Sequence, residues 1–280
     1  MNTVLTITRL TIRETQRRRI LWVALLMGVA FLAVYGLGFH YIFVEVERSG
    51  YRAAALTATT VDFLRMAGLY AIYFLVIAMS ALVSANTISG ELESHTMESV
   101  VTKPIRRWQV VLGKWLGLAI IVAAYTLLLA GGVIAIVFMR SRLMVANAPA
   151  GLGLMVLGGL TMLSLTILGG TRLSTLANGA LAFMLYGVAF IGGWVEQIGA
   201  VLRNETAVDL GIFSSLIMPA DVLWKRAATL FQTPTALGDL NLAGPFVVAS
   251  QPHDRVILYA IFYALGLLAL AMWSFSRRDL

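Results

Sequence analysis

The sequence contains no cysteine and little charge. The absence of cysteine among 280 residues excludes disulfides and cysteine-based metal or redox sites. Charged residues make up 12% of the chain and hydrophobic residues 59%, whereas a soluble domain has about a quarter charged residues. Such a chain cannot cover itself with polar surface, so lipid must surround much of it. We predict an all-α integral membrane protein in which residues 1–280 form a single domain.

Sequence motifs of nucleotide-binding and metal-dependent enzymes are also missing. No G-x-x-x-x-G-K-[ST] phosphate loop is present, since the nearest string, LGKW at 112–115, lacks the first glycine and the hydroxyl residue after lysine. No H-E-x-x-H is present, and His40, His95 and His253 fall in separate segments. We therefore predict a chain that is not an enzyme and binds no cofactor or metal of its own. The net charge of +7 is interpreted as basic residues that set the orientation of the chain in the membrane, and no nucleic-acid partner is expected.

Six hydrophobic stretches are long enough to cross a bilayer, which takes about 20 mostly apolar residues. None has an acidic or basic residue near its middle, which disfavours a secondary transporter driven by protons or sodium ions. His40, Asn178 and Glu196 fall toward the ends of stretches and are interpreted as interfacial or packing residues rather than ligands. The predicted spans are Ile20–Val44, Met66–Ala85, Trp115–Phe138, Leu152–Gly170, Leu176–Val195 and Val256–Phe275.

The positions of lysine and arginine predict the orientation of the chain. With the N-terminus in the cytoplasm, the short inner segments carry more basic residues than the outer ones, and the strongest cluster, Arg17–Arg19, abuts the first span. The first span lacks a clear cleavage site and is expected to be retained as a helix. We predict a multi-pass protein of the cell (inner) membrane with both termini in the cytoplasm.

The N-terminal segment, residues 1–19, has the pattern of an amphipathic helix. Arg9, Arg13 and Arg17 are spaced by four residues and share one helix face, while apolar residues fall on a neighbouring face. This pattern suits a helix that lies in the cytoplasmic interface and turns its basic face toward anionic lipid head groups. A plain positive anchor without a further role is the alternative.

The connection between the second and third spans, residues 86–114, differs in character from the rest of the chain. Its acidic residues are followed at once by a basic run, and Pro104 separates a short helix near residues 96–101 from a helix that begins near Arg106. Met97 and Val100 give the short helix an apolar side, which suits docking into a groove of a soluble partner. The alternative is a solvated loop whose charges only set topology.

Three strings of this chain occur together in a known arrangement. They are ISGELESHTMESVVTKPIRRWQVVLGKWLG in the connection, MPADVLWKRA at 218–227 and FSRRDL at the C-terminus. The combination resembles bacterial ABC transporter permeases of the type-two exporter class, six-span subunits that include the permease of the copper-processing system for nitrous-oxide reductase. His95 departs from the pattern, because the family usually has glycine there. The matching residues in the connection are Ile88, Glu91, Glu93, Thr96, Glu98, Pro104, Ile105, Arg107, Leu112, Gly113 and Lys114.

The resemblance implies an N-terminal elbow helix and, within residues 86–114, a coupling helix that sits in a cleft of a separate ATPase subunit and transmits its ATP-driven movement. It implies a permease homodimer bound to two ATPase subunits, which alone hold ATP and Mg²⁺, and a role in substrate export or conformational signalling. The alternative is a membrane scaffold or intramembrane enzyme whose loop binds another partner. The implied ATPase interface consists of Glu91, Glu93, Thr96, Met97, Glu98, Lys103, Pro104 and Arg107.

The longest outer segment, residues 199–255, is expected to form an extracytoplasmic loop with short helices, followed by irregular chain. Asp221, after Pro219, is expected to cap a helix that runs through Phe231, and Trp224 is of the type that sits at the membrane interface. We favour an interfacial cap that packs on the bundle. The alternatives are a lid or gate over a translocation route and a docking surface for an extracytoplasmic partner.

Overall fold

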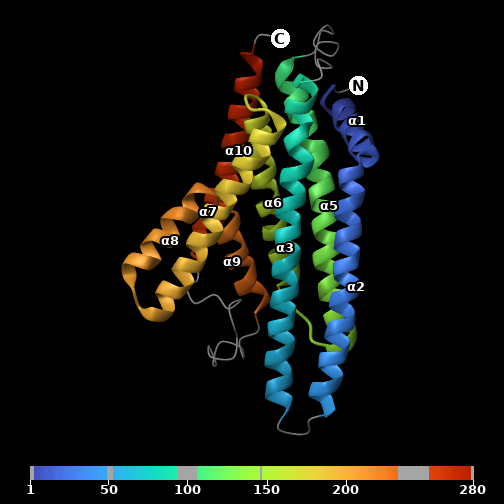
Figure 1. Ribbon diagram of the computed structural model, residues 1–280, viewed down its shortest axis with the longest axis vertical. Coiled ribbons are helices and arrows are strands. Elements are labelled where there is room, and N and C mark those ends of the chain that lie inside the picture. Colours follow the sequence, from blue (N-terminus) through green and yellow to red (C-terminus); the bar gives the residue numbers. More distant parts are fainter. Residues whose placement is uncertain (1–2, 49–52, 94–105, 146, 233–251, 279–280) are drawn as a thin grey trace.

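The computed structural model describes residues 3–48, 53–93, 106–145, 147–232 and 252–278 (Figure 1). This described part is all-helical, and six of its helices, α2, α3, α5, α6, α7 and α10, are long and apolar enough to cross a membrane, which confirms the predicted fold class. The helices are α1 (Thr3–Arg17), α2 (Arg19–Arg48), α3 (Ala53–Glu93), α5 (Arg107–Ser141), α6 (Ala148–Gly170), α7 (Thr175–Leu202), α8 (Glu205–Ile217), α9 (Ala220–Phe231) and α10 (Arg255–Ser276).

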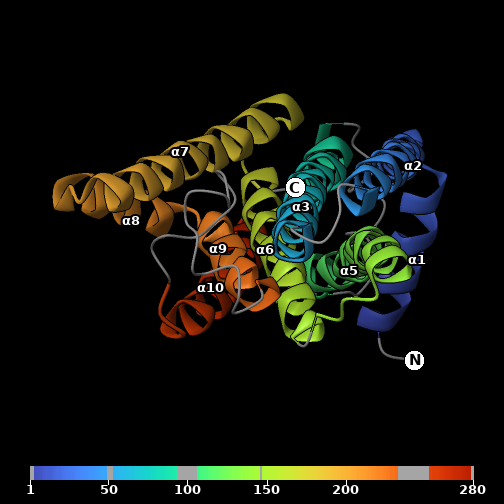
Figure 2. The ribbon, with the colours of Figure 1, turned by 90° about the horizontal axis from the view of Figure 1, so that it is seen from below.

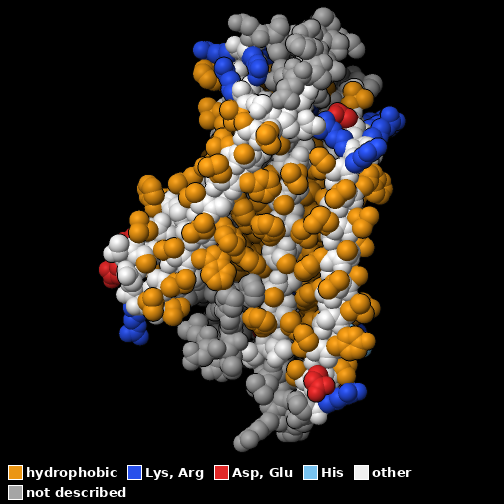
Figure 3. All heavy atoms as spheres, viewed as in Figure 1, with side chains coloured by type: hydrophobic (Ala, Val, Ile, Leu, Met, Phe, Trp, Pro, Cys, Tyr) orange, Lys and Arg blue, Asp and Glu red, His pale blue; other side chains and the backbone are white. Residues whose placement is uncertain are grey.

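The ends of several helices meet at one end of the molecule. The start of α1, the end of α3, the start of α5 and the end of α10 lie together at the top of Figure 1. We call this the predicted cytoplasmic end, and the opposite end the predicted outer end. Between them, hydrophobic side chains cover the visible faces of the helices, and Lys and Arg side chains gather near the ends (Figure 3). This distribution is the one expected of a multi-pass membrane protein.

Helix α6 lies at the centre of the bundle, between α3, α5, α9 and α10 (Figure 2). In its spanning window 61% of the residues are buried, against 11% in α2, which lies at the edge. Two glycines allow large side chains to approach α6. A Cβ atom on Gly158 would lie 2.0 Å from the Tyr73 hydroxyl oxygen, and one on Gly151 would lie 2.4 Å from the Phe231 ring. Small residues therefore let α3 and α9 pack against α6, as is usual between membrane helices.

Helix α1 is separate from α2 and packs on α5. Its buried face consists of Thr8, Thr11 and Thr15, and the Thr8 hydroxyl donates a hydrogen bond of 3.1 Å to the Gly113 carbonyl. A Cβ atom on Gly117 would lie 2.8 Å from the Cβ atom of Thr11, so glycine is what permits this close approach. The buried face of α1 is thus rich in threonine, a feature that the charge pattern did not predict.

Helices α8 and α9, which follow the spanning helix α7, form the part of the fold that the sequence predicted least well. Helix α7 leans away from the bundle, and α8 runs back along it (Figures 1 and 2). The axes of α8 and α9 then differ by 109°, and most of α9 is buried. By length and composition the pair fits a broken span or a re-entrant segment, and the burial of α9 shows that it packs into the bundle.

The predicted helix through Phe231 is confirmed, but two of its details are wrong. Asp221 does not cap α9, because Pro219 occupies the cap position without a side-chain hydrogen bond and the Asp221 carboxylate pairs with Lys225 inside the helix. Trp224 is buried against Tyr70 and Tyr73 of α3 and not placed at a lipid interface. Both errors have one cause, which is that α9 enters the bundle.

Candidate functional site

The residues predicted to contact an ATPase fall around the gap between α3 and α5. Glu91 and Glu93 belong to the last turn of α3, and Arg107 is the first residue of α5. The remaining predicted interface residues lie outside the described part of the chain, so the coupling helix stays a prediction. They are Thr96, Met97, Glu98, Lys103 and Pro104.

A buried lysine joins α3 to α5 close to this gap. Lys114 is 6% exposed, and its Nζ donates a hydrogen bond of 3.0 Å to the carbonyl oxygen of Thr87. A cation near the carbonyl end of a helix also interacts favourably with the helix dipole. The two helices that flank residues 94–105 are therefore connected by a charged hydrogen bond. Lys114 was predicted only as part of the sequence motif, without a structural role.

The C-terminal string holds the same end of the molecule together. The Arg107 guanidinium donates to the Arg278 carbonyl, and the Arg278 guanidinium donates to the Thr171 carbonyl. Arg172 Nε donates to the Ser274 hydroxyl at 3.0 Å. The start of α5, the turn after α6 and the end of α10 are thus one hydrogen-bonded unit.

The predicted membrane-anchor residues Arg9, Arg13 and Arg17 are all exposed along α1. Leu5 and Leu10, which are 64% and 58% exposed, lie on α1 as well. Because the threonine face is occupied by α5, both the basic and the exposed apolar side chains remain available to a membrane surface. Contact with anionic lipid stays a prediction.

An aromatic cluster connects α3, α7 and α9 near the middle of the bundle. The Tyr70 and Trp224 ring centroids are 5.2 Å apart, and those of Tyr186 and Phe190 are 6.2 Å apart, within the range of favourable ring contacts. The Tyr73 hydroxyl donates a 2.6 Å hydrogen bond to the Ala220 carbonyl, so the start of α9 is fixed to α3. The members of the aromatic cluster are Tyr70, Tyr73, Phe74, Tyr186, Phe190, Trp194 and Trp224.

A buried charged cluster connects α7 to α9. Lys225 Nζ lies 2.7 Å from Glu196 Oε2 and 3.0 Å from Asp221 Oδ2, and the three side chains are 4–9% exposed. We call these three residues the acid–lysine cluster. Glu196, interpreted from sequence as an interfacial or packing residue, is thus half of a buried ion pair. Sequence reasoning missed the cluster because Asp221 and Lys225 were assigned to an outer loop, although their spacing of four residues was a usable signal.

A second buried ion pair fixes the other end of α9. Arg65 is fully buried, pairs with Asp62 at 2.6 Å, and donates a 2.7 Å hydrogen bond to the Phe231 carbonyl. Phe231 is the last residue of α9, where a cation is favourable. Helix α9 is therefore held at its start by Tyr73, in its middle by the acid–lysine cluster and at its end by Arg65.

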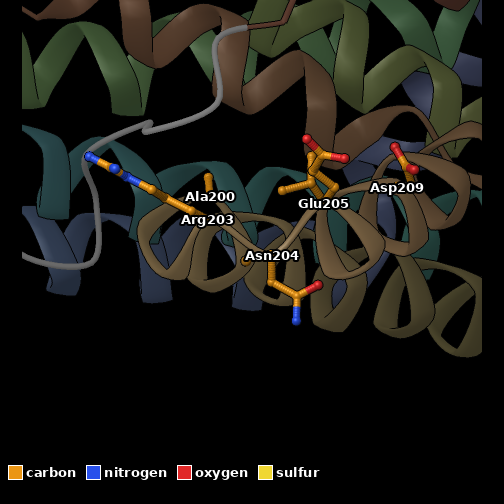
Figure 4. A pocket seen from close by; sticks show the side chains of 7 residues that line it. Ala200, Arg203, Asn204, Glu205 and Asp209 are labelled. Atoms are coloured by element: carbon orange, nitrogen blue, oxygen red, sulfur yellow. The ribbon is translucent and has the colours of Figure 1, made fainter.

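A surface hollow of about 390 Å³ lies where α7 turns into α8. Figure 4 shows Glu205 and Asp209 on α8 beside the hollow, with Arg203 extended away from them. All three side chains are exposed, and the Asn204 side chain is used to cap α8. The hollow is thus an open feature of the turn, in contrast to the buried contacts around α9.

The six spanning helices define a multi-pass membrane protein, and comparison with known families identifies its class. A family model described as ABC-2 family transporter protein matches residues 5–280. The chain belongs to the ABC-2 family of transporter proteins and is a membrane component of an ABC transporter. No curated protein gave a significant match. The narrower likeness to the nitrous-oxide reductase permease stays a prediction.

Proposed function

We propose that this chain is the permease subunit of an ABC transporter and exports a substrate by using ATP that separate ATPase subunits hydrolyse. ATP and Mg²⁺ would be bound by those subunits, and this chain would have no catalytic role. The observation that carries the proposal is the join between α3 and α5. Lys114 connects the two helices that flank residues 94–105, so a force applied to that connection acts on both helices together.

Helix α3 provides the route by which such a force would reach the outer side. It runs without interruption for 41 residues, about 60 Å at 1.5 Å per residue. One end adjoins the proposed coupling region, while Tyr73 at the midpoint of α3 and Arg65 in its other half hold α9. Movement of α3 would therefore act directly on α9. We propose that α9 and the aromatic cluster close the outer side of the translocation route.

The assembly is proposed to contain two permease copies and two ATPase subunits in the bacterial inner membrane, with both termini in the cytoplasm. Native mass spectrometry of the purified assembly would give the copy numbers. A single permease copy bound to ATPase would contradict the homodimer. The scaffold alternative is not supported by a specific contact, and membership of a transporter family argues against it.

Co-purification with the ATPase subunit tests the coupling region. The double variant Met97→Asp with Glu98→Lys replaces the apolar anchor and reverses a charge, so the complex should be lost. Asp209→Lys is the matched control. It also reverses an exposed charge, but on α8 beside the α7–α8 turn, away from the connection between α3 and α5. If the double variant still co-purifies as the wild type does, residues 94–105 are not the coupling site.

A further inference from the structure

The acid–lysine cluster contains two acids and one base. The single ammonium group of Lys225 lies within 3.0 Å of a carboxylate oxygen from each of Glu196 and Asp221. If all three side chains were ionised, the cluster would carry a net charge of −1 at a place that is at most 9% exposed. The acid–lysine cluster therefore contains one buried carboxylate more than the charge of Lys225 can balance.

Among the described residues, no further positive charge pairs with the cluster. The titratable groups that face Asp221, apart from Glu196 and Lys225, are the hydroxyls of Tyr70 and Tyr73 from α3 and of Tyr186 from α7. In the described part of the chain, Arg65 contacts the end of α9 and Arg226 belongs to α9, and both have other acidic partners. Their ion pairs are Arg65 with Asp62 and Arg226 with Asp254.

The space around Asp221 also limits what can neutralise it. A Cβ atom on Gly193 would lie 2.2 Å from Asp221 Oδ2, so the carboxylate packs directly on the α7 backbone. The described residues contain no group of three or more acidic, histidine or cysteine side chains that would hold a metal ion. Lys225 already fills the position between the two carboxylates. A proton is the cation that this arrangement accepts without further ligands.

Physical chemistry favours a proton over an unbalanced charge. An uncompensated buried charge costs several kcal/mol, and two carboxylates that share a site do not both ionise readily. Ionisable side chains inside a membrane bundle also commonly mark a functional site. We infer that the acid–lysine cluster is a proton-binding site, in which Glu196 and Asp221 together hold one proton while α9 is seated in the bundle.

The position of the site connects the proton to the proposed outer gate. The cluster lies between the levels of Tyr73 and Arg65 on α3, in the outer part of the spanning region. Withdrawal of α9 would expose both carboxylates to water, where they ionise at neutral pH and release the proton to the outside. Because the seated state binds more protons, a rise in outer pH favours the withdrawn state. This consequence for gating depends on the proposed function, whereas the proton site does not.

Infrared spectroscopy of the purified permease, without any ATPase, tests the site. A protonated carboxyl has a carbonyl stretch that is separate from the bands of ionised carboxylates. At neutral pH we expect the wild type to show this band, and both Asp221→Asn and Glu196→Gln to lose it, because the remaining acid then pairs with Lys225. Lys225→Met should increase the band, since both acids then take up a proton.

A control variant and the use of two separate variants make the infrared experiment decisive. Asp209→Asn removes an exposed carboxyl on α8 and should leave the band unchanged. Because Asp221→Asn and Glu196→Gln act on different helices, misfolding of one still leaves the other informative. Absence of the band in the wild type at neutral pH, or its survival in both variants, would overturn the inference. If the wild type lacks the band but still binds the ATPase, the proton site is wrong and the proposed function stands. If the wild type shows the band but does not bind the ATPase, the proposed function is wrong and the proton site stands.

Discussion

Replacement of Lys225 by methionine tests the energetic role of the acid–lysine cluster. Methionine keeps the apolar stem but removes the ammonium group, which lies 2.7 Å from Glu196 and 3.0 Å from Asp221. The carboxylates are 4% and 9% exposed, so water does not replace the lost partner. Removal of one partner from a buried ion pair costs about 3–5 kcal/mol, and we expect a loss of folding free energy in this range.

A second route to the magnitude gives a pH dependence. Without the lysine, the carboxyl that was ionised must take up a proton on folding. At pH 7 this is about 3 units above an ordinary carboxyl pKa, and at about 1.4 kcal/mol per unit the cost is about 4 kcal/mol. Acidification makes that proton easier to bind, so the cost should fall by about 1.4 kcal/mol for each unit between pH 7 and the ordinary carboxyl pKa.

Equilibrium unfolding in mixed micelles, followed by tryptophan fluorescence, measures this loss, and Trp224 reports from the same helix. Arg226→Met is the matched control, because its partner Asp254 is 73% exposed and such a surface pair contributes under about 1 kcal/mol. Equal stability of Lys225→Met and the wild type at pH 7 would refute the reasoning. A large loss that does not change with pH would refute the assignment of the loss to carboxyl ionisation.

Three further substitutions test other contacts. Gly158→Ala places a methyl group 2.0 Å from the Tyr73 hydroxyl and should cost about 1–3 kcal/mol; the double variant with Tyr73→Phe should cost less than the sum of the two single changes, measured by the same unfolding assay. Lys114→Met should leave the ATPase complex intact but abolish the stimulation of ATP hydrolysis by the permease. Unchanged stimulation would show that the Lys114–Thr87 hydrogen bond does not transmit movement between the subunits. Gly117→Val should displace α1 and speed tryptic cleavage after Arg13, and an unchanged cleavage rate would show that α1 does not depend on this close approach.

The spans could be predicted because hydropathy acts over many residues at once. All six predicted stretches fall within helices that are long and apolar enough to cross a membrane. The ends of the helices could not be predicted as well as the spans themselves. The predicted span Met66–Ala85 is the central half of α3, which continues from Ala53 to Glu93, because the helix extends into regions where lipid no longer selects for apolar residues.

The parts of the site that depend on long-range contacts were beyond sequence reasoning. Arg9, Arg13 and Arg17 lie exposed on a helix, as predicted. Nothing local indicated that threonines would form its buried face, because that depends on Gly113 and Gly117 of α5. Likewise, the polar character of Asp221 and Lys225 favoured an outer loop. Only the fold brings them to Glu196 and makes their burial tolerable.

The unbroken course of α3 limits how the protein can change shape. Its 41 residues include no proline, so it should rotate as one stiff rod about 60 Å long. A tilt of about 5° about the midpoint displaces each end by about 2.6 Å, nearly the length of a hydrogen bond. The displacement decreases toward the midpoint, to about 1.8 Å at Thr87 and about 1 Å at Arg65, so the contact with Lys114 is stretched more than the contacts that hold α9. A change of shape by tilting α3 therefore requires no unfolding of the bundle, and its effect grows with distance from Tyr73 at the midpoint of the helix.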